Sequence, residues 1–108
     1  MKKIILFLLI LSNVVAYGQR ISAANKFFEE FSYKKSAELF ESIYNKGDSS
    51  QIVLSKLADS YYYNAEFKKA ESWYEKLLRI FEKEETPQHF FRYAQVLKSN
   101  GKVAESDR

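Results

Sequence analysis

The sequence predicts an all-α protein, an α-solenoid of antiparallel helical hairpins preceded by a signal peptide. Three observations support this prediction. Apolar residues recur at helical spacing, the whole pattern recurs along the chain, and the 108 residues include one Pro and three Gly. Because this composition offers few strand or loop signals, we expect one small and almost wholly helical domain.

Residues 1–18 have the layout of a secretory signal peptide. Two lysines precede an apolar run over residues 4–11, and a polar break follows. Small residues flank Tyr17, so we expect cleavage between Gly18 and Gln19, with a cut after Ala16 as the second choice. An uncleaved membrane anchor is the alternative. It is disfavoured because the apolar run falls short of the roughly 20 residues that a spanning helix needs.

The first hairpin is expected to pair a helix over residues 20–30 with a second helix over residues 33–46. Gly47 suits a left-handed helix C-cap. Asp48, followed three residues later by Gln51, is typical of a variant capping box that opens the next helix.

The second hairpin pairs two amphipathic helices that meet at a tight turn near Asn64 and Ala65. Each helix places its apolar residues at spacings of three and four, which puts them on one face. These residues are Leu54, Leu57, Ala58 and Tyr61 in the first helix, and Phe67, Ala70, Tyr74, Leu77, Leu78 and Phe81 in the second. A pair joined by so short a turn packs antiparallel, and the small Ala58 and Ala70 allow a close approach.

The same pattern recurs on both sides of this hairpin. An earlier copy contains Ala24, Phe27, Tyr33, Phe40 and Ile43. Each of them precedes its counterpart in the second hairpin by 34 residues, and the counterparts are Ala58, Tyr61, Phe67, Tyr74 and Leu77. A later copy contains Tyr93, Ala94, Leu97, Gly101, Val103 and Ser106. We therefore expect a helical repeat domain over residues 19–108, with repeats at approximately 19–50, 51–84 and 87–108. A coincidental helical bundle is the alternative.

The third repeat is expected to be incomplete. Thr86 followed by Pro87 is a strong helix start, and that helix should end near Asn100 and Gly101. Val103 would then begin a second helix that has no room to complete two turns. The chain is therefore expected to be the front part of a longer protein; a short capping helix in a small free-standing domain is the other interpretation.

The spacing in the second hairpin resembles the tetratricopeptide repeat, whose signature is small and aromatic residues at fixed offsets within a unit of about 34 residues. The residues that carry the resemblance are Leu57, Ala58, Tyr61, Phe67, Ala70, Tyr74 and Leu77. The chain departs from the family pattern at Ala65, where Gly is usual, and at Leu77, where Ala is usual. These departures suggest a slightly splayed hairpin.

The whole chain also resembles the amino-terminal repeat region of certain OmpA-family outer-membrane proteins of Gram-negative bacteria. The resemblance is carried by residues 16–19, by the Tyr-Tyr-Tyr-Asn segment at 61–64, and by the sequence segment at 91–99. It implies an exported protein of the periplasm or outer membrane, in which any membrane association depends on domains beyond Arg108. It also implies a downstream β-propeller-like segment and a peptidoglycan-binding carboxyl-terminal domain. None of that domain's residues can be assigned here.

No catalytic constellation, cofactor motif or metal-spaced cluster is visible, and we do not expect an enzyme. The chain has no Cys, which excludes thiol chemistry and an amino-terminal lipid anchor. Its formal charge is +3, and its basic residues form no stripe that would bind nucleic acid. The single histidine, His89, is expected to be a solvated surface residue, and the acidic run at 82–85 a solvated helix end.

The function that these observations favour is a helical-repeat scaffold that binds a protein or peptide partner, including other cell-envelope proteins. In stacked hairpins the first helix of each pair lines the concave side. The expected partner-binding groove comprises Asn25, Phe28, Glu29, Ser55, Asp59, Tyr62, Tyr63, Phe91, Gln95 and Lys98. Two interpretations of Tyr62 remain open, groove exposure and packing against the adjacent hairpin. The alternative function is a structural spacer or self-association module that uses the exposed end near Leu97 and Val103.

Overall fold

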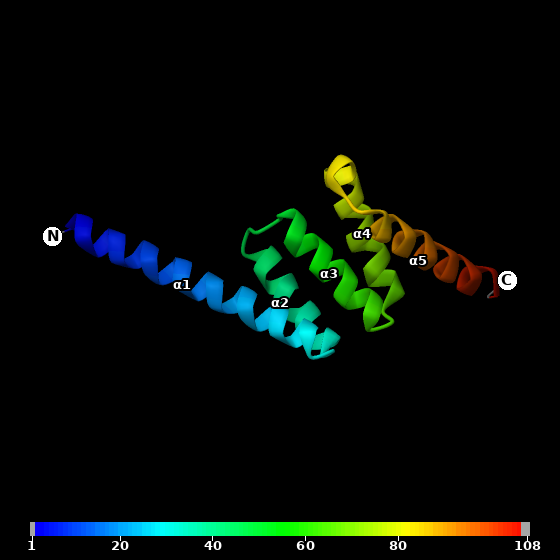
Figure 1. The fold of residues 1–108 in the computed structure, drawn as a ribbon, viewed down its shortest axis with the longest axis horizontal. Helices are drawn as coiled ribbons and strands as arrows, with labels where there is room; N and C mark the ends of the chain where they lie inside the picture. The colour runs from blue at the N-terminus through cyan, green and yellow to red at the C-terminus, as the bar shows by residue number, and fades with distance from the viewer. Residues whose placement is uncertain (1, 107–108) are drawn as a thin grey trace.

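The computed structural model describes residues 2–106, with side chains except those of residues 13 and 102–106. Five α-helices and one short 3-10 turn follow one another within this range (Figure 1). They are α1 (Lys2–Glu29), α2 (Tyr33–Asn45), α3 (Gln51–Tyr63), α4 (Phe67–Phe81), η1 (Glu82–Glu84) and α5 (Pro87–Ser106). No strand occurs between residues 2 and 106, so the predicted all-α class is confirmed.

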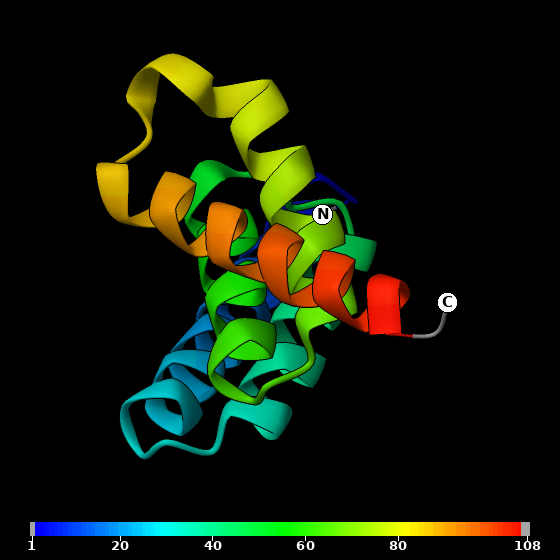
Figure 2. The ribbon, with the colours of Figure 1, turned by 90° about the vertical axis from the view of Figure 1, so that its right-hand side faces the viewer.

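Each helix packs against its neighbours in the chain. Helices α1 and α2 form one antiparallel hairpin, α3 and α4 form a second, and α2 packs against α3 (Figure 1). Helix α5 packs on α4 and makes a smaller contact with α3, which leaves it as the outermost described helix on its side (Figure 2). Because α2, α3 and α4 each have a helix on both sides, the buried surface is continuous along the stack.

The core contains the residues that the helical periodicity singled out. The four expected residues of α3 are buried, and in α4 the expected Ala70, Tyr74, Leu77 and Leu78 are buried as well. Ala58 and Ala70 have no exposed surface, which fits the predicted close approach of the two helices. Phe67 and Phe81 are half-buried and pack against the edge of this core.

The turns of the two hairpins have the same backbone geometry. Phe31 and Ala65 occupy the left-handed region, with φ of 64° and 60°. In each turn the next amide donates to a carbonyl five residues back, that of Phe27 at 2.8 Å and that of Tyr61 at 2.9 Å. This is a Schellman motif, in which Gly usually takes the left-handed position. The two hairpins are therefore alike in their turns as well as in their side-chain pattern.

The connection between α2 and α3 confirms one local prediction and corrects another. Gly47 has a φ of 117°, as expected for a residue that ends a helix. The capping box was wrong, because Ser50 is the N-cap of α3 and Asp48 Oδ1 accepts a hydrogen bond from its amide at 3.0 Å. Gln51 is not available for capping, since its Nε2 donates to Glu85 Oε1 at 2.8 Å.

Helix α5 begins at Pro87 as predicted, but the predicted end near Asn100 and Gly101 was wrong. The helix continues through Gly101 to Ser106. A Cβ at Gly101 would meet nothing within 4 Å, so no described element lies there to redirect the chain. Continuing the helix keeps its backbone groups hydrogen-bonded within the chain. The side chain of Val103 lies outside the described residues.

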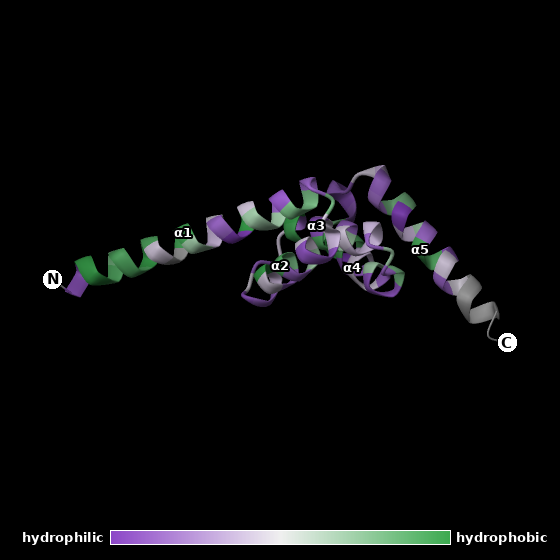
Figure 3. Ribbon diagram, turned by 90° about the horizontal axis from the view of Figure 1, so that it is seen from below, coloured by the Kyte–Doolittle hydropathy of each residue, from purple (hydrophilic) through white to green (hydrophobic). Residues whose placement is uncertain are grey.

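The amino-terminal half of α1 projects away from the other helices. Its large apolar side chains from Ile4 to Val15 are exposed. Figure 3 shows this part of α1 as a mainly hydrophobic stretch that extends away from the other helices. Apart from half-buried Ala16, burial begins at Ile21 and is complete at Ala24. By length and composition α1 could cross a membrane, although signal sequences near an amino terminus pass the same test. The Tyr17 hydroxyl donates to Asp48 near the base of the projecting part.

Candidate partner-binding surface

The residues predicted to form the groove lie on α1, α3 and α5, and they differ in exposure. The half-buried ones are Asn25, Phe28, Ser55 and Tyr62. The exposed ones are Glu29, Tyr63, Phe91, Gln95 and Lys98. Asp59 is buried, with 8% of its surface exposed. Little of Asp59 is open to a partner, so its predicted place as a freely exposed groove residue was wrong. With Ser55 and His89 it lines a cavity of about 330 Å³.

An aromatic cluster joins α1 to α3 at one end of this surface. The ring of Phe28 meets that of Tyr63 edge to face, with centroids 6.1 Å apart. Tyr33, from the start of α2, stacks on Tyr63 at 5.1 Å and completes the cluster. The Lys56 ammonium lies 4.1 Å from the centre of the Phe28 ring, a cation–π contact. Tyr33 was not among the predicted residues, because sequence spacing assigned it to the second helix of its hairpin.

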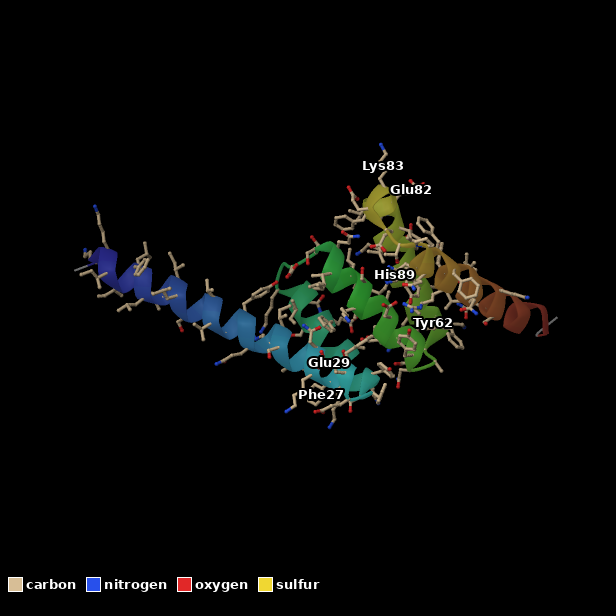
Figure 4. All side chains as sticks on the ribbon, in the orientation of Figure 1. Phe27, Glu29, Tyr62, Glu82, Lys83 and His89 are labelled. Carbon is tan, nitrogen blue, oxygen red and sulfur yellow. The ribbon has the colours of Figure 1, made fainter. Side chains whose placement is uncertain are left out.

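Tyr62 connects α3 to α5. Its hydroxyl donates to Gln95 Oε1 at 2.5 Å, and its ring lies 6.0 Å from Phe67 and 6.3 Å from Tyr74. The Arg92 guanidinium lies 5.8 Å from the same ring. Of the two interpretations of Tyr62, these contacts support packing against the adjacent helices. Figure 4 shows Tyr62 at the junction of α3 with α5.

A shallow depression of about 480 Å³ lies along α5. It is lined by Phe91, Ala94, Gln95, Lys98 and Ser99. Phe91, Gln95 and Lys98 were predicted to face the groove, and they are brought together because they stand four and three residues apart on one helix. Gln95, which accepts the hydrogen bond from Tyr62, connects the depression to α3.

Beneath this surface, the Asp59 carboxylate of α3 is held by three donors. Its Oδ1 accepts hydrogen bonds from the Tyr74 hydroxyl at 2.6 Å and from Arg92 Nη1 at 3.0 Å. Its Oδ2 lies 3.1 Å from His89 Nε2. A buried carboxylate is costly unless it is paired and hydrogen-bonded, and these donors from α4 and α5 meet that requirement.

The prediction for His89 was wrong. His89 was expected on the surface without a partner, but 13% of its side chain is exposed and both ring nitrogens have carboxylate partners. Nδ1 is hydrogen-bonded to Glu85, whose own side chain is almost fully covered. Figure 4 shows His89 pointing from α5 toward α3. The only local sign of a partner for His89 was Glu85, four residues earlier in the sequence. The other partner, Asp59, is 30 residues away and could not be recognised from local spacing.

The pKa shifts favour the charged forms of His89 and Asp59. The hydrogen bond to Asp59, followed by the charges of Asp59 and Glu85, raises the pKa of His89 in spite of its burial. Burial alone would raise the pKa of Asp59, but the hydrogen bonds and charges of His89, Tyr74 and Arg92 together lower it. An imidazolium that donates from both nitrogens has no lone pair for a metal or for proton abstraction. Within the described residues, no group of three or more His, Cys, Asp or Glu side chains is placed to hold a metal ion.

The chain matches no family model, no curated protein and no solved structure.

Proposed function

We propose that this chain is an exported helical-repeat scaffold that binds a protein or peptide partner through the surface shared by α1, α3 and α5. The observation that carries the proposal is the placement of exposed aromatic residues on this surface, Tyr63 on α3 and Phe91 on α5. Aromatic side chains bury a large area at low entropic cost and often anchor interfaces. The polar network below fixes α3 relative to α5, so the two anchors are held at a set separation.

The recurrence of the hairpin supports a repeat architecture of the tetratricopeptide type. The left-handed residues Phe31 and Ala65 occupy equivalent places in the two hairpins and have the same hydrogen bonds around them. Helices α1 and α3 are the first helices of their hairpins, and α5 occupies the corresponding place after α4. A surface composed of first helices is where repeat proteins of this kind bind extended partners.

Export is the second part of the proposal. The apolar run over residues 4–11 is exposed along its length. Apart from half-buried Ala16, burial starts at Ile21, just after the expected cleavage between Gly18 and Gln19. Cleavage there would remove no residue of the core. Expression in a Gram-negative host with amino-terminal sequencing of the envelope fraction tests this directly: a chain that begins at Gln19 supports export, and an intact chain that stays in the cytoplasm refutes it.

The cell-envelope assignment and the role as the front module of a longer OmpA-like protein depend on the resemblance stated above. Sequencing the gene downstream of the Arg108 codon tests that role. An in-frame continuation into a propeller and a peptidoglycan-binding domain supports it. Continuation into an unrelated domain counts against it.

The binding surface is tested by exchanging its exposed anchors. Tyr63→Ala combined with Phe91→Ala should abolish cross-linking to the partner in the envelope fraction, because both rings are exposed and neither lies in the buried core. Tyr63→Phe keeps the contacts of this ring with Phe28 and Tyr33 and should leave the fold unchanged. Ile80→Ala is the matched control, since Ile80 is an exposed apolar residue on α4, away from this surface. The helical circular-dichroism signal should be unchanged in all three variants. Partner cross-linking that persists in the double variant would refute the proposed surface.

A further inference from the structure

Helix α5 is held in different ways along its length. Further along the helix Val96 is fully buried, and Asn100 Nδ2 donates to the first carbonyl of α4 at 3.2 Å. The first turns of α5 are held mainly through charge, because His89 and Arg92 both bind Asp59 of α3. Helices α3 and α5 otherwise meet over a small area. Residues 87–92 can therefore shift relative to α3 while the packing around Val96 is kept.

The imidazole of His89 is surrounded by titratable and charged groups from every element near it. These groups are Asp59 and Lys56 on α3, Tyr74 on α4, Glu85 in the connection before α5, and Arg92 on α5 itself. Burial and the charge of Asp59 raise the pKa of Tyr74, so its hydroxyl stays neutral. His89 is the group in this set whose side chain ordinarily changes charge near neutral pH. Its hydrogen bond to Asp59 raises its pKa, so the ring loses its proton above pH 6.5.

Loss of that proton leaves one donor for two carboxylates. A neutral imidazole has one N–H and one lone pair, so either Asp59 or Glu85 must then face the lone pair. Asp59 keeps the positive Arg92 guanidinium as a donor, whereas the remaining donors to Glu85 are neutral, Gln51 Nε2 at 2.8 Å among them. Glu85 therefore needs the proton more. It stays on Nδ1 of His89, and Nε2 presents its lone pair to Asp59.

The bond that is lost is the one between helices. Glu85 and His89 lie on one stretch of chain, four residues apart, and their bond does not hold α5 on α3. The bond from Nε2 to Asp59 does, and in the neutral ring a lone pair faces the carboxylate instead. The first turns of α5 should then move away from α3. Phe91 lies in these turns, so its position relative to Tyr63 changes with them.

We propose that His89, Asp59 and Glu85 form a pH-sensitive latch between α3 and α5, which the protonated ring closes and the neutral ring opens. Opening the latch shifts the first turns of α5 and alters the partner-binding surface. The effect on binding rests on the proposed function, whereas the movement of α5 does not.

The titration of His89 can be observed directly, because the sequence contains one His. The ring ¹⁵N chemical shifts are followed from pH 5.5 to pH 9 in the full chain. The chain is kept in a mild non-ionic detergent, since the large apolar side chains from Ile4 to Val15 are exposed. We expect protons on both nitrogens at pH 5.5 and on Nδ1 alone at pH 9. A proton on Nε2 alone, or on both nitrogens at pH 9, would overturn the proposal.

The movement is measured by pulsed electron paramagnetic resonance between spin labels on introduced cysteines, because the chain has no Cys of its own. Glu38→Cys with Gln88→Cys labels exposed positions on α2 and in the first turn of α5. Glu38→Cys with Ile80→Cys is the matched control, on α2 and α4. The first distance should change by about 2 Å or more, the size of a helix shift, as His89 titrates. The control distance should stay constant.

Two variants separate the latch from other effects of pH. His89→Lys keeps a cation that can donate to both carboxylates, so the pH 5.5 distance should persist at pH 9. His89→Gln carries no charge and should show the shifted distance already at pH 5.5. Circular dichroism establishes that both are helical. A constant distance in the chain with His89 while its ring loses the proton, or a full pH response in His89→Gln, would overturn the latch.

Cross-linking to the partner in the envelope fraction tests the effect on binding. It should be severalfold weaker at pH 9 than at pH 5.5, and His89→Lys should remove this difference. Equal cross-linking at both pH values would overturn the control of binding by the latch. An absence of cross-linking at both values would refute the proposed surface, while the distance measurement would still decide whether the latch exists.

Discussion

His89 Nε2 of α5 lies 3.1 Å from Asp59 Oδ2 of α3, and this hydrogen bond joins two helices that otherwise meet over a small area. The remaining contacts of α5 are mainly with α4. The bond belongs to a network in which His89 lies between the carboxylates of Asp59 and Glu85, with Arg92 and Tyr74 on the far side of Asp59. The position of α5, and with it the partner-binding surface, depends on these charges.

Replacing His89 should destabilise the chain more than a surface substitution does. His89→Gln removes the positive charge and can no longer donate to both carboxylates, which leaves buried Asp59 or Glu85 short of a partner. We expect the free energy of unfolding to fall by about 1–3 kcal/mol, the cost of leaving a buried polar group unsatisfied. Urea denaturation at pH 5.5 followed by circular dichroism measures this fall. Gln88→Ala, a change at the exposed neighbouring position, should have little effect; an equal loss in both variants would contradict the network.

The same network predicts how stability depends on pH. The pKa of His89 is raised above 6.5 in the folded chain, so its contribution is complete below about pH 6.5 and is lost as the pH rises through the folded value. The pKa of Asp59 is lowered below 3.8, so its contribution is present above about pH 3.8 and is lost as the pH falls through the folded value.

The midpoint temperature of thermal unfolding should therefore be highest between about pH 3.8 and about pH 6.5, and it should fall as the pH rises above this range. In the His89→Gln variant the alkaline decline should be smaller, because the titrating group is gone. A decline of the same size in both proteins would show that another group is responsible.

Ala58 and Ala94 form a matched pair for testing the packing. They stand at equivalent positions of α3 and α5, but Ala58 is fully buried and Ala94 is exposed. Ala58→Leu should lower the free energy of unfolding by about 1–3 kcal/mol through overpacking. Ala94→Leu should change it by less than about 0.5 kcal/mol, as an exposed substitution does. Similar losses in the two variants would mean that α5 is covered in solution.

Much of the fold followed from the sequence, because apolar periodicity determines which face of a helix is buried. The core of α3 and α4 and the turn at Ala65 were predicted in this way. The start of α5 was predicted from local residue types, Thr86 followed by Pro87. Periodicity does not say which polar residue from another helix will meet a given side chain. Asp59 was therefore placed at the surface, although donors 15, 30 and 33 residues away in sequence cover it.

The end of α5 was missed for a related reason. Asn100 and Gly101 are residues that can end a helix, and they correspond to Asn64 and Ala65 at the end of α3. After Asn64 and Ala65, however, the chain turns into α4, which packs on α3. Without such a helix in the described residues, α5 continues to Ser106. Local residue preferences alone do not decide a helix end when the packing partner is not present.

A substitution at Ala65, the left-handed residue in the second turn, should stabilise the chain and not destabilise it. Ala65 has a φ of 60°, which an L-residue other than Gly adopts at a steric cost. Ala65→Gly should therefore raise the free energy of unfolding by up to about 1 kcal/mol, after the greater flexibility of Gly in the unfolded chain is deducted. Ala94→Gly, in the middle of α5, should lower it by about 0.5–1 kcal/mol. Destabilisation by both substitutions would exclude the left-handed turn at Ala65.

The proposed binding surface depends most on the recurrence of one hairpin unit along the chain. Backbone chemical shifts of the chain in solution test this recurrence most directly. We expect shifts typical of positive φ at Phe31 and at Ala65, each between helical runs that match α1 with α2 and α3 with α4. Helical shifts that continue through either residue, or extended shifts within any of the four helices, would contradict the repeat and the surface derived from it.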